Sequence, residues 1–303
     1  MNSSTSKVKR VGDTVEDKCL NIINIILLSI LLILYVYPLY FIIIASLSDP
    51  NAIWNGEVTI VPVNFSLEGY QEILKNSDLL RGYLNSIFYT TVGVLVNLFF
   101  TLTAAYVLAC REFMLRNVIL KIFTFTMFFS GGLIPRFLLV QNLGLVNTMW
   151  ALILPGAASV FNIIITRTFF MSSIPYDLKE AALLDGCRHI HYFISIVLPL
   201  STAVISVIAL YYGVGHWNSY FDAMIYLRSR IKFPLPLFLR EIILTTTAML
   251  ETTGNMEDFA KQMRLAEIVK YCAILVASIP AIAAYPFVQK FFVKGVMIGS
   301  IKG

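Results

Sequence analysis

The chain has 303 residues, of which 58% are hydrophobic and 14% are charged, and its mean hydropathy is +0.77. Soluble domains carry roughly 25% charged residues, so this composition excludes an ordinary water-soluble domain and favours a membrane protein. The formal charge of +5 does not by itself predict nucleic-acid binding, because in a membrane protein the placement of Lys and Arg is the informative feature.

Six apolar stretches are each long enough to cross a bilayer core, which takes about 20 mostly apolar residues. They cover roughly residues 20–47, 83–110, 118–140, 146–170, 199–226 and 265–292. The positive-inside rule places the basic residues around the first two stretches in the cytoplasm: Lys7, Lys9, Arg10, Lys18, Arg111 and Arg116. The sequence thus predicts a transmembrane domain, residues 20–292, between two cytoplasmic tails, residues 1–19 and 293–303.

Two of the stretches contain helix-breaking residues. Ser130-Gly131-Gly132 and Pro135 interrupt the third, and Pro155-Gly156 interrupts the fourth. Irregular backbone at membrane depth is tolerated only where protein or a cavity satisfies its polar groups. The segment 130–135 is therefore either a gate or bend inside the span, or the plain end of a helix near the outer surface. Before the second span, residues 48–82 predict an ordered external loop with a short helix near 67–74.

The cytoplasmic loop of residues 172–199 has the strongest pattern in the chain. Ser172, Ser173 and Pro175 suit the start of a short helix, and Gly186 suits its left-handed end. A second helix follows, with one apolar face and a break at its closing proline: Ile190, Phe193, Ile194, Val197, Leu198 and Pro199. The first helix presents Glu180 beside two small residues that permit close approach by another protein, Ala181 and Ala182. The loop therefore predicts a docking element.

Glu180-Ala181-Ala182, the glycine at 186 and Ile196-Val197-Leu198-Pro199 resemble the EAA loop of permease subunits in ATP-binding-cassette (ABC) importers. The resemblance implies an all-α integral membrane fold, namely the six-helix bundle of a type I importer permease with a cytoplasmic coupling helix. It further implies that this helix inserts into a groove of a cytoplasmic ATPase. The coupling residues would be Glu180, facing a basic residue there, Ala181, Ala182, Asp185, and Gly186, which permits the sharp reversal.

Other segments resemble the maltose-type carbohydrate permeases, specifically the partner similar to the smaller maltose subunit: residues 143–148, 153–155, 215–218, 289–295 and 302–303. Residues 130–135 and 228–241 further resemble a polysaccharide or lipo-oligosaccharide branch. The implied protein lies in the lipid of the bacterial cytoplasmic membrane as a multi-pass subunit. Its implied partners are a second permease subunit in a heterodimer, two cytoplasmic ATPase subunits, an external solute-binding lipoprotein and an oligosaccharide moved by alternating access.

Polar side chains inside a span are costly and tend to face partner helices or a wet pathway. The fifth stretch is the richest in them, and its aromatic rings and amides suit the faces and hydroxyls of sugars. Trp and Tyr also gather at membrane interfaces, so that explanation stays open. The candidate pathway residues are Asn97, Asn162, Tyr212, His216, Trp217, Asn218 and Asp222.

Catalytic and metal sites are not predicted. His189 and His191 are two residues apart and point to different helix faces, the four cysteines lack ligand spacing, and no GxxxxGK[ST] loop occurs. We therefore expect no cofactor on this chain, no enzyme activity of its own, and hydrolysis of Mg-ATP on separate ATPase subunits. Two alternatives stay open: the same machinery carrying peptides or another solute, and an ion-coupled secondary transporter, which would need acidic residues near the midplane and an internal repeat.

Overall fold

The computed structural model describes residues 15–248, 264, 266–283, 286 and 289, and their regular structure is entirely helical. In chain order the elements are α1 (Val15–Ser46), α2 (Pro50–Trp54), α3 (Glu68–Lys75), α4 (Ser77–Ala109), α5 (Arg116–Phe128), α6 (Leu133–Asn142), α7 (Trp150–Ile153), η1 (Leu154–Gly156), α8 (Val160–Ser173), α9 (Tyr176–Leu184), α10 (His189–Tyr192), η2 (Phe193–Val197), α11 (Leu198–Leu200), α12 (Thr202–Trp217), α13 (Tyr220–Tyr226), η3 (Arg230–Lys232) and α14 (Leu235–Ala248). A last helix covers Ala266–Ala283. The predicted tails lie almost wholly outside the described residues, as do most of the matching segments after residue 283.

Three of these helices are long and apolar enough to cross a membrane without interruption: Lys18–Ser46, Ser77–Ala109 and Ala266–Ala283. Three further candidates are bent pairs, in which the two halves meet at 115° (α5 and α6), 52° (α7–η1 and α8) and 82° (α10–α11 and α12). Length and composition therefore allow three spans, or up to six if each bent pair counts as one.

The third predicted span, 118–140, is not one straight helix. The helix α5 ends at Phe128, and its 13 residues cover only about 20 Å. The chain turns at Gly132, whose φ of 83° suits glycine, and α6 then begins with Pro135 in its first turn. The structure therefore has a sharp bend at this segment, and its depth in the membrane stays a prediction.

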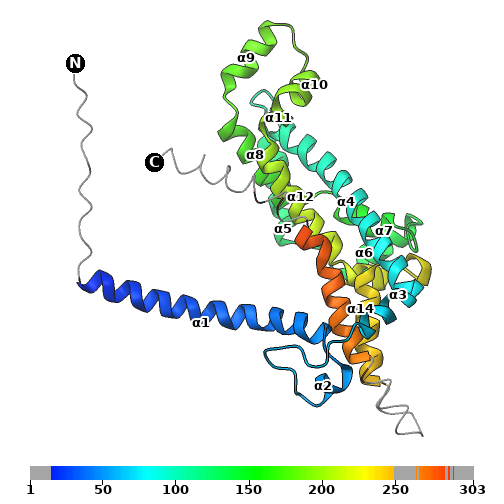
Figure 1. Cartoon of the computed structure of the whole chain (residues 1–303). Coiled ribbons are helices and arrows are strands. Elements are labelled where there is room, and N and C mark those ends of the chain that lie inside the picture. The colour runs from blue at the N-terminus through cyan, green and yellow to red at the C-terminus, as the bar shows by residue number, and fades with distance from the viewer. Residues whose placement is uncertain (1–14, 249–263, 265, 284–285, 287–288, 290–303) are drawn as a thin grey trace.

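The core lies where α4, α8 and α12 run side by side (Figure 1). One buried cluster joins them to the loop of residues 172–199, with α9 and α10 each contributing a side chain: Leu102, Ala105, Leu108, Ile163, Phe170, Ala182, Tyr192, Val197, Val204, Ile208 and Tyr212. Figure 1 shows α9 and α10 at one end of this bundle and α2, α3 and α14 towards the other. The loop is thus packed on the same core as the long helices.

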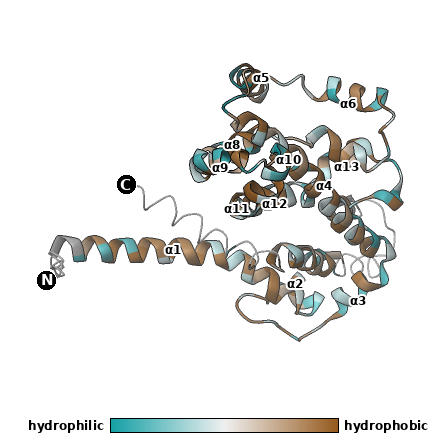
Figure 2. Cartoon of the chain, turned by 90° about the horizontal axis from the view of Figure 1, so that it is seen from above, coloured by the Kyte–Doolittle hydropathy of each residue, from teal (hydrophilic) through white to brown (hydrophobic). Residues whose placement is uncertain are grey.

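The first helix leaves the bundle at a wide angle (Figure 1), and it is exposed along residues 18–40. Figure 2 shows that most of its length is hydrophobic. Only its last turn is buried, where the Tyr70 hydroxyl donates to Ser46 Oγ at 2.9 Å and Cys272 Sγ donates to the Ser46 carbonyl at 3.4 Å. An apolar surface of this kind suits lipid or another apolar chain.

Candidate functional site

The loop of residues 172–199 begins differently from the prediction. Ser172 and Ser173 are the last residues of α8, and Ser172 Oγ donates back to the Phe169 carbonyl at 3.3 Å. The residue before α9 is Pro175, in an extended conformation and with no side-chain cap, so the helix starts at Tyr176. Predicting a serine cap was wrong because the preceding helix runs on to the serines and uses them first.

The end of α9 matches the prediction. Gly186 has φ 76°, its amide donates to the Leu183 carbonyl at 3.0 Å, and the Cys187 amide donates to the Ala182 carbonyl at 2.9 Å. This pair of bonds is a Schellman motif, which satisfies carbonyls that the helix end would leave open. The left-handed stop at Gly186 is confirmed.

The second helix of the loop differs from the predicted regular face. Residues 193–197 form a π-helical turn, and the buried side chains are Tyr192 and Val197, five positions apart, whereas Ile190 and Ile194 are exposed. The extra residue of a π turn rotates the face, which a 3.6-residue period cannot anticipate. The 82° bend also falls at Ser201, two residues beyond Pro199, since the proline occupies the first turn of α11, where no amide is needed.

The helix α9 has two distinct faces. Glu180, Ala181 and Asp185 are exposed, and Leu184 at the outer tip is 89% exposed. Lys179 and Ala182 point the other way and are buried, at 7% and 9% exposure. The small side chain of Ala182 therefore packs within this chain, and Ala181 is the alanine of the motif that is left open to a partner.

The sequence did not single out Lys179, yet it makes the main polar contact of α9. Its ammonium lies 2.6 Å from Glu112 Oε2, in the turn between α4 and α5, and the Tyr176 hydroxyl donates to Glu112 Oε1 at 2.8 Å. The Arg111 guanidinium lies over the Tyr176 ring, 4.6 Å from its centroid. The only signal available was positional, because Lys179 and Ala182 are three residues apart and share a helix face.

The ionisation of this pair follows from its contacts. The hydrogen bond from Lys179 lowers the pKa of the Glu112 carboxyl to about 2. Burial opposes the charged form of Lys179, but the hydrogen bond to Glu112 and the electrostatic attraction of Cys110, Glu112 and Tyr176 together outweigh it and raise the pKa of the ammonium above its ordinary 10.5. The depressed Glu112 pKa means that its stabilising contribution is present above the ordinary 4.5 and is lost only as the pH falls towards 2. The pair is thus ionised between pH 4.5 and 10.5.

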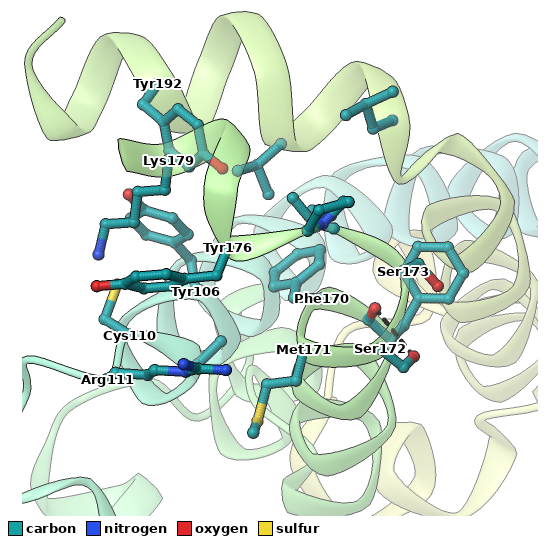
Figure 3. Close-up of a pocket in the computed structure, with 16 residues that line it drawn as sticks. Tyr106, Cys110, Arg111, Phe170, Met171, Ser172, Ser173, Tyr176, Lys179 and Tyr192 are labelled. Atoms are coloured by element: carbon teal, nitrogen blue, oxygen red, sulfur yellow. Dashed lines mark hydrogen bonds between the residues drawn. The ribbon is translucent and has the colours of Figure 1, made fainter. Parts of the chain in front are cut away.

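A cavity of about 720 Å³ lies beside this pair, between the ends of α4 and α8 and the start of α9. Figure 3 shows Tyr106, Cys110, Arg111, Tyr176 and Lys179 gathered on one side of it, with Ser172 and Ser173 on the other. Two further hydrogen bonds hold the C-terminal end of α4. The Tyr106 hydroxyl donates to the His189 carbonyl at 3.4 Å, and Arg167 Nε donates to the Leu108 carbonyl at 2.9 Å.

Three of the candidate pathway residues come together in the bundle. Asn97 is 1% exposed, its Oδ1 lies 2.8 Å from His216 Nε2, and its Nδ2 donates to the Gly156 carbonyl at 2.6 Å. The Tyr212 hydroxyl lies 2.6 Å from Thr101 Oγ1 and accepts from the Ser159 amide at 3.0 Å. Since Gly156 and Ser159 flank the break in the fourth predicted span, these side chains satisfy the open backbone groups there.

The other four candidates lie apart from this group. Asn162 is buried on α8, and the Trp217 indole donates to the Ala277 carbonyl at 3.1 Å and packs edge-on against Tyr83. Asn218 Nδ2 donates to the Val214 carbonyl at 2.9 Å, and Asp222 forms a 3.5 Å ion pair with Arg136. No group of three or more His, Cys, Asp or Glu side chains in the described part of the chain is placed to hold a metal ion.

A model of the family described as "Binding-protein-dependent transport system inner membrane component" matches residues 115–298. Among curated proteins, Protein LplC of Bacillus subtilis (strain 168) is 38% identical over 298 residues, which cover 98% of this chain and 100% of the relative. The polygalacturonan/rhamnogalacturonan transport system permease protein YtcP of the same strain is 39% identical over 269 residues, 88% of this chain and 93% of the relative.

Among solved structures, one chain of a bacterial ABC transporter involved in the import of the acidic polysaccharide alginate is 32% identical. It matches with a TM-score of 0.84, over 92% of this chain and 98% of its own. The likeness covers nearly the whole chain, so it extends well beyond the loop that carries the motif.

Proposed function

Because the chain belongs to the family of binding-protein-dependent transport system inner membrane components, we propose that it is the permease subunit of an ATP-driven importer that carries oligosaccharides across the bacterial cytoplasmic membrane by alternating access. The observation that carries the proposal is α9: a short helix at one end of an apolar helical bundle, with Glu180 and Ala181 exposed and its other face packed on the core. Family membership does not favour an ion-coupled secondary transporter.

The complex would contain a second permease subunit, two ATPase subunits and an external binding lipoprotein. Mg-ATP would be hydrolysed on the ATPase subunits, against which α9 would dock through Glu180, Ala181 and the tip at Asp185. Rigid-body movement of α9 and its flanking helices would then rock the two bundles around a central site. Both termini of this chain would lie in the cytoplasm.

The docking role is tested in the purified complex, co-expressed with its partner subunits. Glu180→Ala removes the exposed carboxylate, and Gly186→Asp places a branched charged side chain at φ 76°; both should lower the yield of co-purified ATPase and ATP-dependent uptake. Gly186→Asn is the matched control, because both asparagine and aspartate tolerate the left-handed conformation and differ here in charge, so the asparagine variant should retain most activity. Unchanged co-purification and uptake in both test variants would overturn the assignment of α9.

We assign an oligosaccharide cargo because the names of relatives refer to polygalacturonan, rhamnogalacturonan and the acidic polysaccharide alginate. A peptide importer would share the motor but not the external binding protein. Thermal-shift measurements of the cognate binding protein against neutral oligosaccharides, uronic-acid oligosaccharides and peptides separate these classes. Stabilisation by peptides alone would contradict the proposal.

The proposed pathway residues are Asn97, Asn162, Tyr212, His216, Trp217, Asn218 and Asp222. Asn97 and His216 bond to each other in this conformation, so a sugar hydroxyl would reach them only after the pair separates. His216→Gln should then raise the KM for uptake more than it changes the maximal rate. A fall in maximal rate with unchanged KM would assign His216 to holding the bundle rather than to the sugar.

A further inference from the structure

We propose that Glu112 is a positioning residue, which transmits the movement of α9 to α4 through its ion pair with Lys179. The inference rests on the proposed function of α9 as the contact with the ATPase. It gives the turn between α4 and α5 a role in the transport cycle that neither the loop motif nor the family match assigns.

The ion pair joins two elements that are 67 residues apart in sequence. The Lys179 side chain is 9% exposed, and a buried ammonium is costly unless a counter-charge accompanies it. Glu112, in the turn between α4 and α5, supplies that charge at 2.6 Å. A pair within one helix would simply move with that helix, whereas this pair ties α9 to the cytoplasmic end of α4.

The contact also restricts how α9 can move relative to the turn between α4 and α5. Tyr176 lies one helical turn before Lys179, and the two side chains hold the two oxygens of the same carboxylate, at 2.8 Å and 2.6 Å. Arg111 covers the Tyr176 ring from the α4 side. Two bonds from one face of α9 to one carboxylate resist both rotation and sliding of the helix against the turn.

The apolar contact of α9 with the core is made by Ala182, one turn beyond the polar contact. At the first turn, a cavity of about 720 Å³ occupies the space between the α4 end, the α8 end and the start of α9, and the side chains of Tyr176 and Lys179 line it (Figure 3). Movement of the first turn of α9 therefore reaches α4 through Glu112 and its partners, beside the packing of Ala182.

The α4 helix can carry that movement into the bundle. It is continuous over 33 residues, and Asn97 lies about 18 Å along its axis from Ala109. Asn97 and Thr101 are the α4 residues that bond to His216 and Tyr212 of α12 and thereby hold the break at 156–159. A displaced α4 would change the contacts that close the bundle around the proposed pathway.

The test uses the full complex in nanodiscs and two fluorescent labels in separate preparations. The native Cys187 reports the coupling loop, and Leu84→Cys, which is 66% exposed, reports the far half of α4; the remaining cysteines are replaced by alanine. Mg-ATP with vanadate traps the ATPase. With the native Glu112 and Lys179 in place, both labels should change their emission when the ATPase is trapped.

Glu112→Lys and Lys179→Glu should leave the Cys187 response intact but reduce the Leu84 response between about threefold and thirtyfold, the range of coupling energies in such networks. The exchanged pair, Glu112→Lys with Lys179→Glu, should restore it. Glu112→Gln is a milder variant, which keeps the size of the side chain and removes its charge, and it should also reduce the Leu84 response. Glu267→Gln is the control, because Glu267 pairs with Lys270 inside one helix.

The outcomes separate the two proposals. Any of three results would overturn the role of Glu112 while leaving α9 as the docking helix. They are a Leu84 response that is absent with the native pair, one that persists in both single reversals, and one that stays lost in the exchanged pair. Absence of the Cys187 response with the native pair would overturn the docking role of α9, and the inference with it.

Discussion

The closest approach between α4 and α12 depends on one side chain being absent. A Cβ atom at Gly93 would lie 2.5 Å from His216 Nε2, and the imidazole cannot swing away without breaking its 2.8 Å bond to Asn97. Asn97 in turn holds the Gly156 carbonyl at 2.6 Å. A single glycine therefore sets the position of a buried chain of hydrogen bonds that crosses three elements.

Gly93→Ala should destabilise the protein by about 1–3 kcal/mol relative to Gly213→Ala, since overpacking of a fitted site has that cost. Gly213 is the matched control, because it lies in α12 and its Cβ would meet Val94 Cγ2 at an ordinary 3.8 Å. Both variants gain the same helix propensity, so their difference isolates the contact with His216. Thermal denaturation of the purified complex in detergent measures this difference in stability, and equal melting temperatures of the two variants would contradict the argument.

Tyr212→Phe removes a hydroxyl that serves two buried groups, Thr101 Oγ1 and the Ser159 amide. Leaving the amide unpaired should cost about 1–2 kcal/mol, the range for hydrogen bonds inside membrane bundles and for buried unsatisfied donors. Thr101→Val should cost less, because no backbone group loses its partner. A double-mutant cycle on thermal stability should show that the two losses are not additive; strict additivity would mean that the hydroxyls do not interact.

At the scale of elements, the break at 156–159 is held by side chains from α4 and α12. The sequence predicted where the chain interrupts its helices, at 130–135, at Pro155-Gly156 and at Gly186, because glycine and proline act locally. It did not predict the π turn at 193–197, which goes with the burial of Tyr192 and Val197, or the bend at Ser201, where Pro199 lies in the first turn of α11. Glu112 was missed for the same reason, as its partner is 67 residues away.

The loop between α6 and α7 shows how one residue joins two connections. Asn147 has φ 62°, its Oδ1 accepts from the Arg228 and Ser229 amides at 3.1 Å each, and its carbonyl accepts from Lys232 Nζ at 2.6 Å. An asparagine suits both demands, because it tolerates the left-handed conformation and carries an acceptor.

Asn147→Asp keeps the acceptor and should preserve the segment 226–232. Asn147→Gly suits the left-handed conformation but loses both hydrogen bonds to the side chain. Asn147→Ala loses the same hydrogen bonds and adds about 1–2 kcal/mol for an alanine in the left-handed conformation. Amide hydrogen exchange of residues 226–232 in the complex should therefore rise in the order Asp, Gly, Ala. Protection in the alanine variant equal to that in the aspartate variant would show that the side chain does not hold this segment.

At the scale of the whole molecule, polar contacts constrain the number of crossings. Arg230 pairs with Asp78 at 2.7 Å, and Lys232 bonds to Asn147, so residues 78, 147 and 230 share one side of the membrane. Glu112 and Lys179 share a side as well. Because α4 runs from residue 77 to 109, it separates the two groups. The bent pairs α5–α6, α7–α8 and α10–α12 must then each cross once, which favours six spans when α1 and the last helix are added.

This arrangement makes a prediction about sidedness that single cysteines can test. Ile60 and Ile231 should lie outside, and Leu115 and Leu184 should lie in the cytoplasm; all four are 58–89% exposed. In a chain without native cysteines, a membrane-impermeant maleimide should label the first two positions in intact cells and the other two only after permeabilisation. Leu115 lies in the turn between α4 and α5, so the two inner positions are on different elements. Labelling of Leu115 in intact cells, or protection of Ile231 there, would contradict the six-span arrangement and with it the cytoplasmic placement of the coupling loop.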